Sequence, residues 1–465
     1  MNRISQGVMS AWMRMGTRFL PFADAATVDL PLSRLLRLSL FQVSVGMSLV
    51  LLIGTLNRVM IVELNVSASL VGIMISLPLI FAPLRAVIGF RSDTHRSALG
   101  WRRVPFLYRG TMIQFGGLAI MPFALLVLSR GENAAHVPVW IGQLAAALSF
   151  LMVGVGLHTT QTVGLALATD LASAESKPKV VGLMYVMLLF GTIASAMLFG
   201  ALLADFTPAR LIQVIQGTAV ATLVLNAVAL WKQEPRRRSQ PPQAAVRLPS
   251  FRESLACFVE GRDAMRRLVT VGLGTMAFSM GDVLLEPYGG QVLLLSVGDT
   301  TKLTATLALG GLLGFALASR VLSRGADPFW MASCGVVVGI PAFAAVILAA
   351  PLASAPLFAV GTLLIGFGAG LFGHGTLTAT MNLAPPDQAG LALGTWGAVQ
   401  ASAAGLAIAL GGVIRDLVAA TAPPGALGPA ASYGVVYSIE VVLLFAALAA
   451  MAPLIRRPKV LAQAG

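Results

Sequence analysis

Long apolar runs, separated by short polar segments, follow one another along almost the whole chain. A transmembrane helix needs about 20 consecutive, mainly apolar residues, and segments of the chain repeatedly have or approach this length. Segments this long exclude a barrel built from short strands of alternating polarity. We expect twelve helices, over residues 38–62, 70–90, 104–128, 138–168, 180–204, 211–231, 268–296, 303–322, 329–350, 354–381, 389–414 and 433–454.

One polar stretch, residues 232–267, divides these helices into six and six. It is basic and rich in proline, a composition that does not bury a hydrophobic core. The sequence predicts a cytoplasmic N-terminal segment, a six-helix bundle, a cytoplasmic linker, a second six-helix bundle and a cytoplasmic tail, at residues 1–36, 37–231, 232–267, 268–455 and 456–465. An apolar stripe with arginines set away from it predicts an interfacial helix over residues 2–20, with Ile4, Val8, Trp12, Met15 and Phe19 in the stripe.

The composition supports a membrane protein. Hydrophobic residues make up 57% of the 465 residues, charged residues only 11%, and the mean hydropathy is +0.84. A water-soluble protein carries about a quarter charged residues, so the chain is predicted to be an integral membrane protein. Cys257 and Cys334 have no metal-ligand spacing and are expected to be free thiols.

The positive charge lies mainly on one side of the predicted membrane topology. With both termini in the cytoplasm, 25 of the 32 lysines and arginines are cytoplasmic, four lie on the opposite side, and three lie within or at the ends of helices. This asymmetry follows the positive-inside rule. We therefore attribute the net charge of +13 to membrane orientation and anionic lipid, with no nucleic acid as a partner.

The polar segment between the second and third expected helices contains Gly89, Asp93, Arg96, Arg102 and Arg103. A Gly-x-x-x-Asp pattern followed by basic residues, a glycine and paired arginines resembles the loop between helices 2 and 3 of major facilitator transporters. In those transporters the loop latches one end of the central cavity. The resemblance implies the same role of conformational latch for these five residues. The alternatives are that the loop only fixes the membrane orientation, or that it is a docking surface for partners.

An internal repeat supports the same fold. Residues 154–172 align without gaps on residues 366–384, which places Gly156 on Gly368 and Asp170 on Asn382. Two halves related by an axis along the membrane normal produce such a repeat. The sequence thus predicts an all-α integral membrane protein with the 12-helix major facilitator fold, two six-helix halves, and both termini cytoplasmic.

Ionisable residues within membrane helices are costly, and each is a candidate functional residue. The candidates that could contact a pigment or face a cavity are Asn57, Arg58, Glu63, Arg85, His158, Asp282, Glu286 and His374. Asn57 is not ionisable and is included because it directly precedes Arg58.

Two carboxylates and two histidines among these candidates allow alternative interpretations. Asp282 and Glu286 are four residues apart, which places them on one helix face, and the Glu-Pro-Tyr-Gly-Gly run that starts at Glu286 is expected to break that helix. The two acids either face a cavity, for a proton, a cation or a metal-bearing ligand, or pair with an arginine of the first two helices. His158 and His374 are either axial ligands of the magnesium in a chlorin or packing residues.

Several segments carry a more specific resemblance. Leu30–Met47 and Gly54–Leu64 around the first helix, and Asp282–Leu293 in the seventh, resemble the PucC/LhaA family, the bacteriochlorophyll-associated branch of the major facilitators from phototrophic bacteria. The resemblance implies an assembly factor for light-harvesting complexes, with LH1 favoured over LH2. Such a factor would deliver bacteriochlorophyll to the light-harvesting α and β polypeptides or chaperone their assembly. It would lie in the bacterial inner, photosynthetic membrane, in contact with lipid, with the reaction centre or pigment-synthesis enzymes as further partners.

Two other classes of function compete with this one. A proton-coupled secondary transporter of a small or amphipathic solute would use Asp282 or Glu286. A prenyl-transferring enzyme would need carboxylates spaced to hold magnesium diphosphate. No two aspartates of the chain lie within four positions of each other, so the sequence disfavours an enzyme.

Overall fold

The structure is a computed structural model that describes residues 30–80, 88, 91–92, 101–129, 136–173, 176–234, 263–383, 389–421 and 429–455. These ranges contain helices and turns and no strand. The interfacial helix expected over residues 2–20 and most of the linker lie outside the described residues, as does the tail.

Each of the twelve expected segments contains helix. The N-terminal half contains α2 (Leu32–Leu38), α3 (Leu40–Leu49), the π-helical η2 (Val50–Leu56) and η3 (Val59–Glu63), α4 (Ala68–Ile80), α6 (Val104–Leu128), α7 (Val139–Leu171), α8 (Lys177–Leu202) and α9 (Pro208–Leu230). The C-terminal half contains α11 (Ala264–Ser279), α12 (Leu285–Gln291), α13 (Val297–Leu322), α14 (Pro328–Ala349), α15 (Ala355–Leu383), α16 (Ala389–Thr421), α17 (Pro429–Met451) and the short η5 (Ala452–Leu454).

Most of these helices are long enough to cross a bilayer. In the described part of the chain, ten helical stretches have the length and hydropathy of a membrane span, the first being the continuous run Leu32–Glu63. The second expected segment is described only as α4, and the seventh is divided into α11 and α12. Large apolar side chains such as Phe123, Leu144, Phe190 and Phe445 are exposed on the outer helices, as a surface facing lipid requires. The protein is therefore a multi-pass membrane protein.

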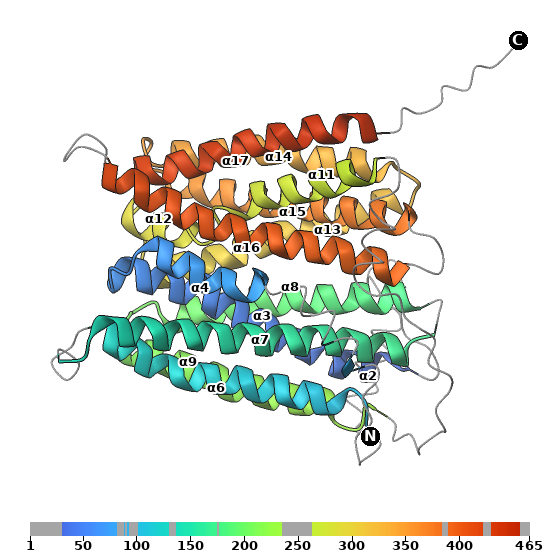
Figure 1. The fold of residues 1–465 in the computed structure, drawn as a ribbon, viewed down its shortest axis with the longest axis horizontal. Helices are drawn as coiled ribbons and strands as arrows, with labels where there is room; N and C mark the ends of the chain where they lie inside the picture. Colours follow the sequence, from blue (N-terminus) through green and yellow to red (C-terminus); the bar gives the residue numbers. More distant parts are fainter. Residues whose placement is uncertain are drawn as a thin grey trace, which may run out of the picture.

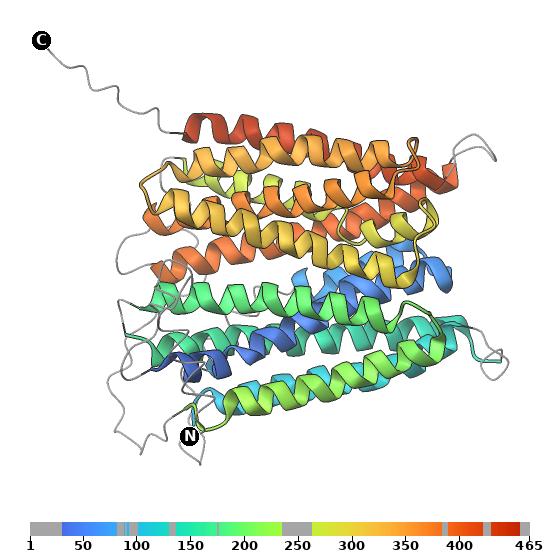
Figure 2. The ribbon, with the colours of Figure 1, turned by 180° about the vertical axis from the view of Figure 1, so that it is seen from behind.

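The two halves lie side by side, with their helices running nearly parallel (Figures 1 and 2). Between them, α4 packs on α16, and α8 packs on α13. α9 ends and α11 begins at one end of the bundle, which we call the linker end, where α2 also begins and α17 ends (Figure 1). The opposite end, where η3 leads into α4, we call the distal end.

The break in the seventh expected segment lies earlier than predicted. α11 ends at Ser279 and α12 begins at Leu285, so the chain turns at residues 280–284, and the run from Glu286 to Gly290 is helical. Pro287 lies in the first turn of α12, where backbone N–H groups have no partner within the helix and a proline is tolerated. Near Gly281 the helix breaks. The backbone N–H of Gly281 donates to Glu440 Oε1 at 2.6 Å, whereas in a continuous helix it would donate to the carbonyl oxygen four residues earlier.

Glycines bring the helices of the C-terminal half into backbone contact. A methyl group on Gly366 would collide with the carbonyl oxygen of Leu307 on α13, and one on Gly368 would lie 2.6 Å from that of Gly335 on α14. A methyl group on Gly370 would lie 2.5 Å from the carbonyl oxygen of Gly311. Small residues allow such close approach between membrane helices, so this glycine-rich run of α15 serves helix packing.

We expect Gly366→Ala to destabilise the C-terminal half by about 1–3 kcal/mol, the cost of overpacking against backbone that cannot rotate away. The measurement is the melting temperature of the purified protein in detergent. Gly373→Ala is the matched control, because it lies on the same helix and its methyl group would meet nothing within 4 Å. Equal melting temperatures for the two variants would contradict this account of the packing.

Candidate functional site

Two arginines of the expected latch bind an acidic partner at the linker end. Arg102 Nη2 lies 2.5 Å and Arg103 Nε 3.0 Å from Asp170 Oδ2, near the end of α7. Arg103 also donates to the hydroxyl of Ser92 at 2.6 Å. Asp170 is the residue that the internal repeat aligns with Asn382, and its pairing with these arginines was not predicted from the sequence. The other latch candidates, Gly89, Asp93 and Arg96, lie outside the described residues.

A carboxylate that the sequence did not single out holds the start of α6. Glu234, just beyond α9, accepts the backbone N–H groups of Arg102 at 2.8 Å, Arg103 at 3.0 Å and Val104 at 2.9 Å. The first N–H groups of a helix lack partners and favour a negative charge. These contacts of the paired arginines join α6, α7 and the end of α9, all within the N-terminal half.

At the distal end, the end of the first membrane segment is tied to the seventh. Asn57 is buried and donates from Nδ2 to the carbonyl oxygen of Val283 at 3.0 Å, in the turn between α11 and α12. Arg58, only 4% exposed, forms an ion pair with Glu63 and donates from Nη2 to the carbonyl oxygen of Leu295 at 3.2 Å. The three candidates Asn57, Arg58 and Glu63 therefore lie together, and two of them hold backbone of the other half.

Glu286 is buried at the same interface. It lies on α12 and accepts a hydrogen bond from the hydroxyl of Thr304 on α13. Gly54 on η2 makes room for it, since a methyl group there would lie 2.7 Å from Glu286 Oε1. Arg58 acts on Glu286 electrostatically, while Arg58 donates its hydrogen bonds to Glu63 and to the carbonyl oxygen of Leu295. Arg85, the other arginine expected near these acids, lies outside the described residues.

Asp282 faces a different environment from Glu286, because the helix breaks between the two residues. Asp282 lies in the turn before α12 and lines a cavity of about 320 Å³ between the halves. Thr192 of α8 borders the cavity from the N-terminal half, and Thr304 and Gln400 border it from the C-terminal half. The remaining lining is mainly small or apolar, including the glycines at the seam of α13 and α15. The expectation that the two acids share one helix face is therefore wrong.

Three further charged residues of the C-terminal half were missed. Glu440 on α17 is fully buried, although the rule for ionisable residues in membrane helices applies to it as well. Arg415 and Asp416 lie in α16, and Arg415 donates to Gln291 Oε1 at 2.8 Å and lies 5.0 Å from the ring centre of Tyr433. The sequence placed Arg415 in a polar loop, because the apolar run was judged to end before it.

Asp416 joins the two halves at the distal end. One of its oxygens accepts both the backbone N–H of Ser69, at 2.7 Å, and the hydroxyl of Ser69 at the start of α4. The other oxygen lies 2.9 Å from Arg415 Nη1. Together with Asn57 and Arg58, this contact ties the halves at the distal end by buried or half-buried polar groups.

The two candidate histidines lie in opposite halves and do not form one site. His158 is buried in α7 and has protein contacts of its own. His374 is half-buried in α15, and its ring centre lies 4.2 Å from that of Phe315 on α13. The Nδ1 atom of His374 has no hydrogen-bond partner among the described residues.

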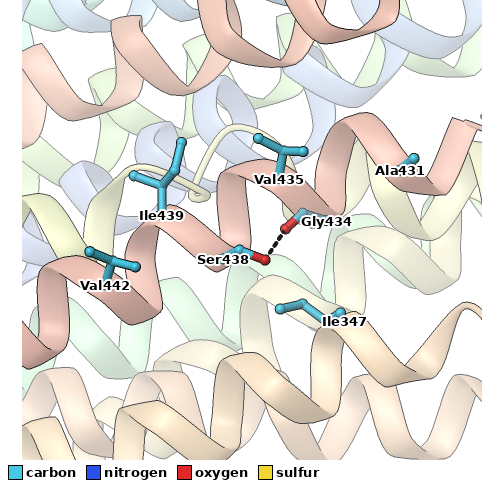
Figure 3. A pocket seen from close by; sticks show the side chains of 7 residues that line it. All are labelled: Ile347, Ala431, Gly434, Val435, Ser438, Ile439 and Val442. Carbon is cyan, nitrogen blue, oxygen red and sulfur yellow. Dashed lines mark hydrogen bonds between the residues drawn. The ribbon is translucent and has the colours of Figure 1, made fainter. Parts of the chain in front are cut away.

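A shallow groove of about 400 Å³ runs along the outer face of α17 (Figure 3). Its lining comes from α17 and, through Ile347, from α14. The one hydroxyl in the lining, that of Ser438, donates to the carbonyl oxygen of Gly434 at 2.8 Å (Figure 3). The groove is otherwise apolar, as is the rest of the lipid-facing surface.

We expect Asp416→Ala to loosen the distal end, because the N–H and the hydroxyl of Ser69 lose their shared acceptor. Hydrogen bonds to a charged group contribute about 1.5–3 kcal/mol, so amide exchange at the start of α4 should become at least roughly tenfold faster. Hydrogen–deuterium exchange with mass spectrometry measures this. Asp205→Ala removes an exposed ion pair with Arg210 and serves as the control; unchanged exchange in Asp416→Ala would contradict the tie.

Comparison with solved structures places this architecture among transporters. A bacterial homologue of the human lysosomal transporter Spinster, in an inward-facing conformation, matches with a TM-score of 0.64 at 16% identity, covering 92% of this chain and 98% of that one. A bacterial homologue of the iron transporter ferroportin matches with a TM-score of 0.65 at 15% identity, covering 92% and 99%. At these identities the likeness concerns the fold alone, and it confirms the expected major facilitator fold.

Sequence comparison is more specific. Protein PucC of Rhodovulum sulfidophilum is 65% identical over 90% of this chain and 92% of that protein, and Protein PucC of Cereibacter sphaeroides is 57% identical over 98% of both. An uncharacterised protein of the puhA-bchM intergenic region of Rhodobacter capsulatus is 53% identical over 94% of this chain and 92% of that protein. The PUCC protein family matches residues 55–459. This multi-pass membrane protein, in which polar groups of the first and the last helical segments hold the break between α11 and α12, therefore belongs to the PucC family.

Proposed function

We propose that the protein is an assembly factor for photosynthetic light-harvesting complexes in the inner, photosynthetic membrane of a bacterium. It would deliver bacteriochlorophyll to the α and β polypeptides or chaperone their assembly. We favour LH1 over LH2 as the complex that it assembles. The observation that carries this proposal is membership of the PucC family across nearly the whole chain. Membrane lipid, the reaction centre and pigment-synthesis enzymes are the further partners that the proposal includes.

The geometry favours work at the lipid-facing surface over transport of a bulky polar solute. The cavity between the halves is about 320 Å³ and its lining is mainly small or apolar, with Asp282 as the one acidic side chain among the described residues that line it. The outer surface carries many exposed aromatic and aliphatic side chains on several helices. Hydrophobic pigments and single-span polypeptides both reach a membrane protein through the bilayer, where this surface lies.

A proton-coupled secondary transporter is the second candidate, because the solved structures with this fold include transporters. Asp282 on the cavity and Glu286 beside Arg58 would then be the groups that take up a proton. An enzyme is not proposed: the family and the fold resemble membrane transporters, and a relative named bacteriochlorophyll synthase 44.5 kDa chain is only 28% identical.

Deletion of the gene in its phototrophic host should decrease the near-infrared absorption bands of LH1, of LH2 or of both, and re-expression should restore them. Absorption spectra of isolated membranes measure this, with total bacteriochlorophyll determined in parallel.

Two outcomes distinguish the candidate functions. Unchanged LH1 and LH2 bands in the deletion strain would exclude the assembly role. A solute flux that depends on the proton gradient and is lost in Glu286→Gln would establish the transporter, whereas loss of the bands with no flux of any tested solute would count against it.

His374 fits a pigment better than His158, because it is half-buried, lies against Phe315 and has an unpartnered Nδ1. We expect the purified protein to carry bacteriochlorophyll and His374→Ala to weaken its binding at least about tenfold, as losses at metal-ligand shells do. The pigment-to-protein ratio measures this. His136→Ala, at an exposed position, is the matched control, and equal ratios for the two variants would remove His374 as a ligand.

A further inference from the structure

Glu440 lies in the middle of α17, is the one charged residue of that helix, and is fully buried. Its Oε1 accepts the N–H of Gly281 at 2.6 Å. Its Oε2 is also buried and has no hydrogen-bond partner in the described part of the chain. No ion pair to Glu440 is formed among these residues. An ionised carboxylate here would cost several kcal/mol, because the side chain is fully buried and no cationic side chain of the described residues pairs with it.

A second carboxylate makes ionisation of Glu440 still less favourable. Asp282, which follows Gly281 directly, acts electrostatically on Glu440 and also lines the cavity between the halves. Two carboxylates that share a site without a cation do not both ionise readily. Glu286 also has a buried Oε2 without a partner among the described residues, but it has Thr304 as a hydrogen-bond donor and Arg58 as a positive neighbour, and Glu440 has no such cation among those residues.

A phenol completes the surroundings of this carboxyl group. Tyr437 lies three residues before Glu440 on α17, and its hydroxyl is buried without a hydrogen-bond partner in the described structure. Its ring edge and the Glu440 carboxylate both lie over Gly281, where a methyl group would be 2.7 Å from Tyr437 Cε1 and 2.9 Å from Glu440 Oε2. Among the described groups, the principal electrostatic neighbour of the phenol is Glu440. Both side chains thus have a buried oxygen without a hydrogen-bond partner in the described structure, and both adjoin Gly281.

The remaining charged groups on neighbouring helices are directed elsewhere. The elements packed against α17 carry these further ionisable groups: Arg266, Arg267, Tyr288, Cys334, Arg415 and Asp416. The arginine pair begins α11, at the opposite end of that helix from Gly281. Arg415 contacts Gln291, Tyr433 and Asp416, and Tyr288 donates its hydroxyl to the carbonyl oxygen of Val346 at 3.0 Å.

We propose that Glu440 is a proton-binding site in the core of the C-terminal half, and that it exchanges its proton with the cavity between the halves through Asp282. The proton resides on Oε2, while Oε1 keeps the N–H of Gly281 at the break of the seventh segment. A metal ion is a poor alternative, because Mg²⁺ takes octahedral oxygen coordination and Ca²⁺ takes six to eight oxygens. Among the buried side-chain atoms of Glu440 and Tyr437 in the described structure, two oxygens, Oε2 and the phenol oxygen, lack a hydrogen-bond partner, which is fewer than either ion takes. The proposal stands independently of the light-harvesting role.

Infrared difference spectroscopy of the full-length protein in lipid nanodiscs tests this site, because a protonated carboxyl group has a C=O stretch that an ionised one lacks. At neutral pH we expect this band in the wild-type protein and its loss in Glu440→Gln. Asp205→Asn, at an exposed carboxylate, is the control and should leave the band unchanged. In Asp282→Asn the band should persist, but its exchange in deuterated buffer should slow by about a hundredfold, as loss of a positioned proton-transfer group does.

Three results would contradict the proposed proton site, and a fourth would contradict the proton route through Asp282. A band that survives in Glu440→Gln, or that disappears when Na⁺, Mg²⁺ or Ca²⁺ is added at constant pH, would show that Glu440 does not hold a proton. Unchanged exchange in Asp282→Asn would exclude the route through the cavity. Glutamine resembles a protonated glutamate in shape and keeps an oxygen for Gly281, so failure of Glu440→Gln to fold would likewise contradict a neutral side chain at this position.

Discussion

Within the membrane, water is absent, and each backbone group freed from a helix needs a partner inside the protein. At the break of residues 280–284, side chains from other helices provide these partners. Glu440 of the last helix accepts the N–H of Gly281, Asn57 of the first segment donates to the carbonyl oxygen of Val283, and Arg58 donates to that of Leu295 just after α12. The broken segment therefore depends on polar side chains of both halves, and those side chains are buried because they serve it.

Glycine makes these polar contacts possible. Charged side chains come close to backbone at Gly54, Gly281 and Gly290, where a methyl group would lie about as close as a hydrogen bond to Glu286, Glu440 and Arg58 respectively. Elsewhere in the C-terminal half, glycines let α13, α14 and α15 touch through their backbones. The same residue type thus serves two purposes, close packing of apolar helices and access of a carboxylate or guanidinium group to its partner.

The two ends of the molecule are organised differently. At the distal end, Asn57, Arg58 and Asp416 connect the halves through hydrogen bonds to the opposite half. At the linker end, Arg102 and Arg103 bind Asp170, and Glu234 holds the start of α6, so these contacts join α6, α7 and the start of the linker. A protein that keeps one end tied and presents a wide apolar surface is suited to partners that approach within the bilayer, which is consistent with the proposed assembly role.

The sequence by itself determined the membrane class, the all-helical fold and the family, because segment length, hydropathy and local motifs are properties of consecutive residues. The sequence also selected Arg58 and Glu63, because charged residues stand out in an apolar segment, and Asn57, because it is next to Arg58. In the structure these three residues lie together. It could not pair Arg103 with Asp170, separate Asp282 from Glu286, or recognise that Glu440 replaces a helix carbonyl for Gly281. Those facts join residues far apart in the chain, and only the packing of helices decides which buried polar groups satisfy one another.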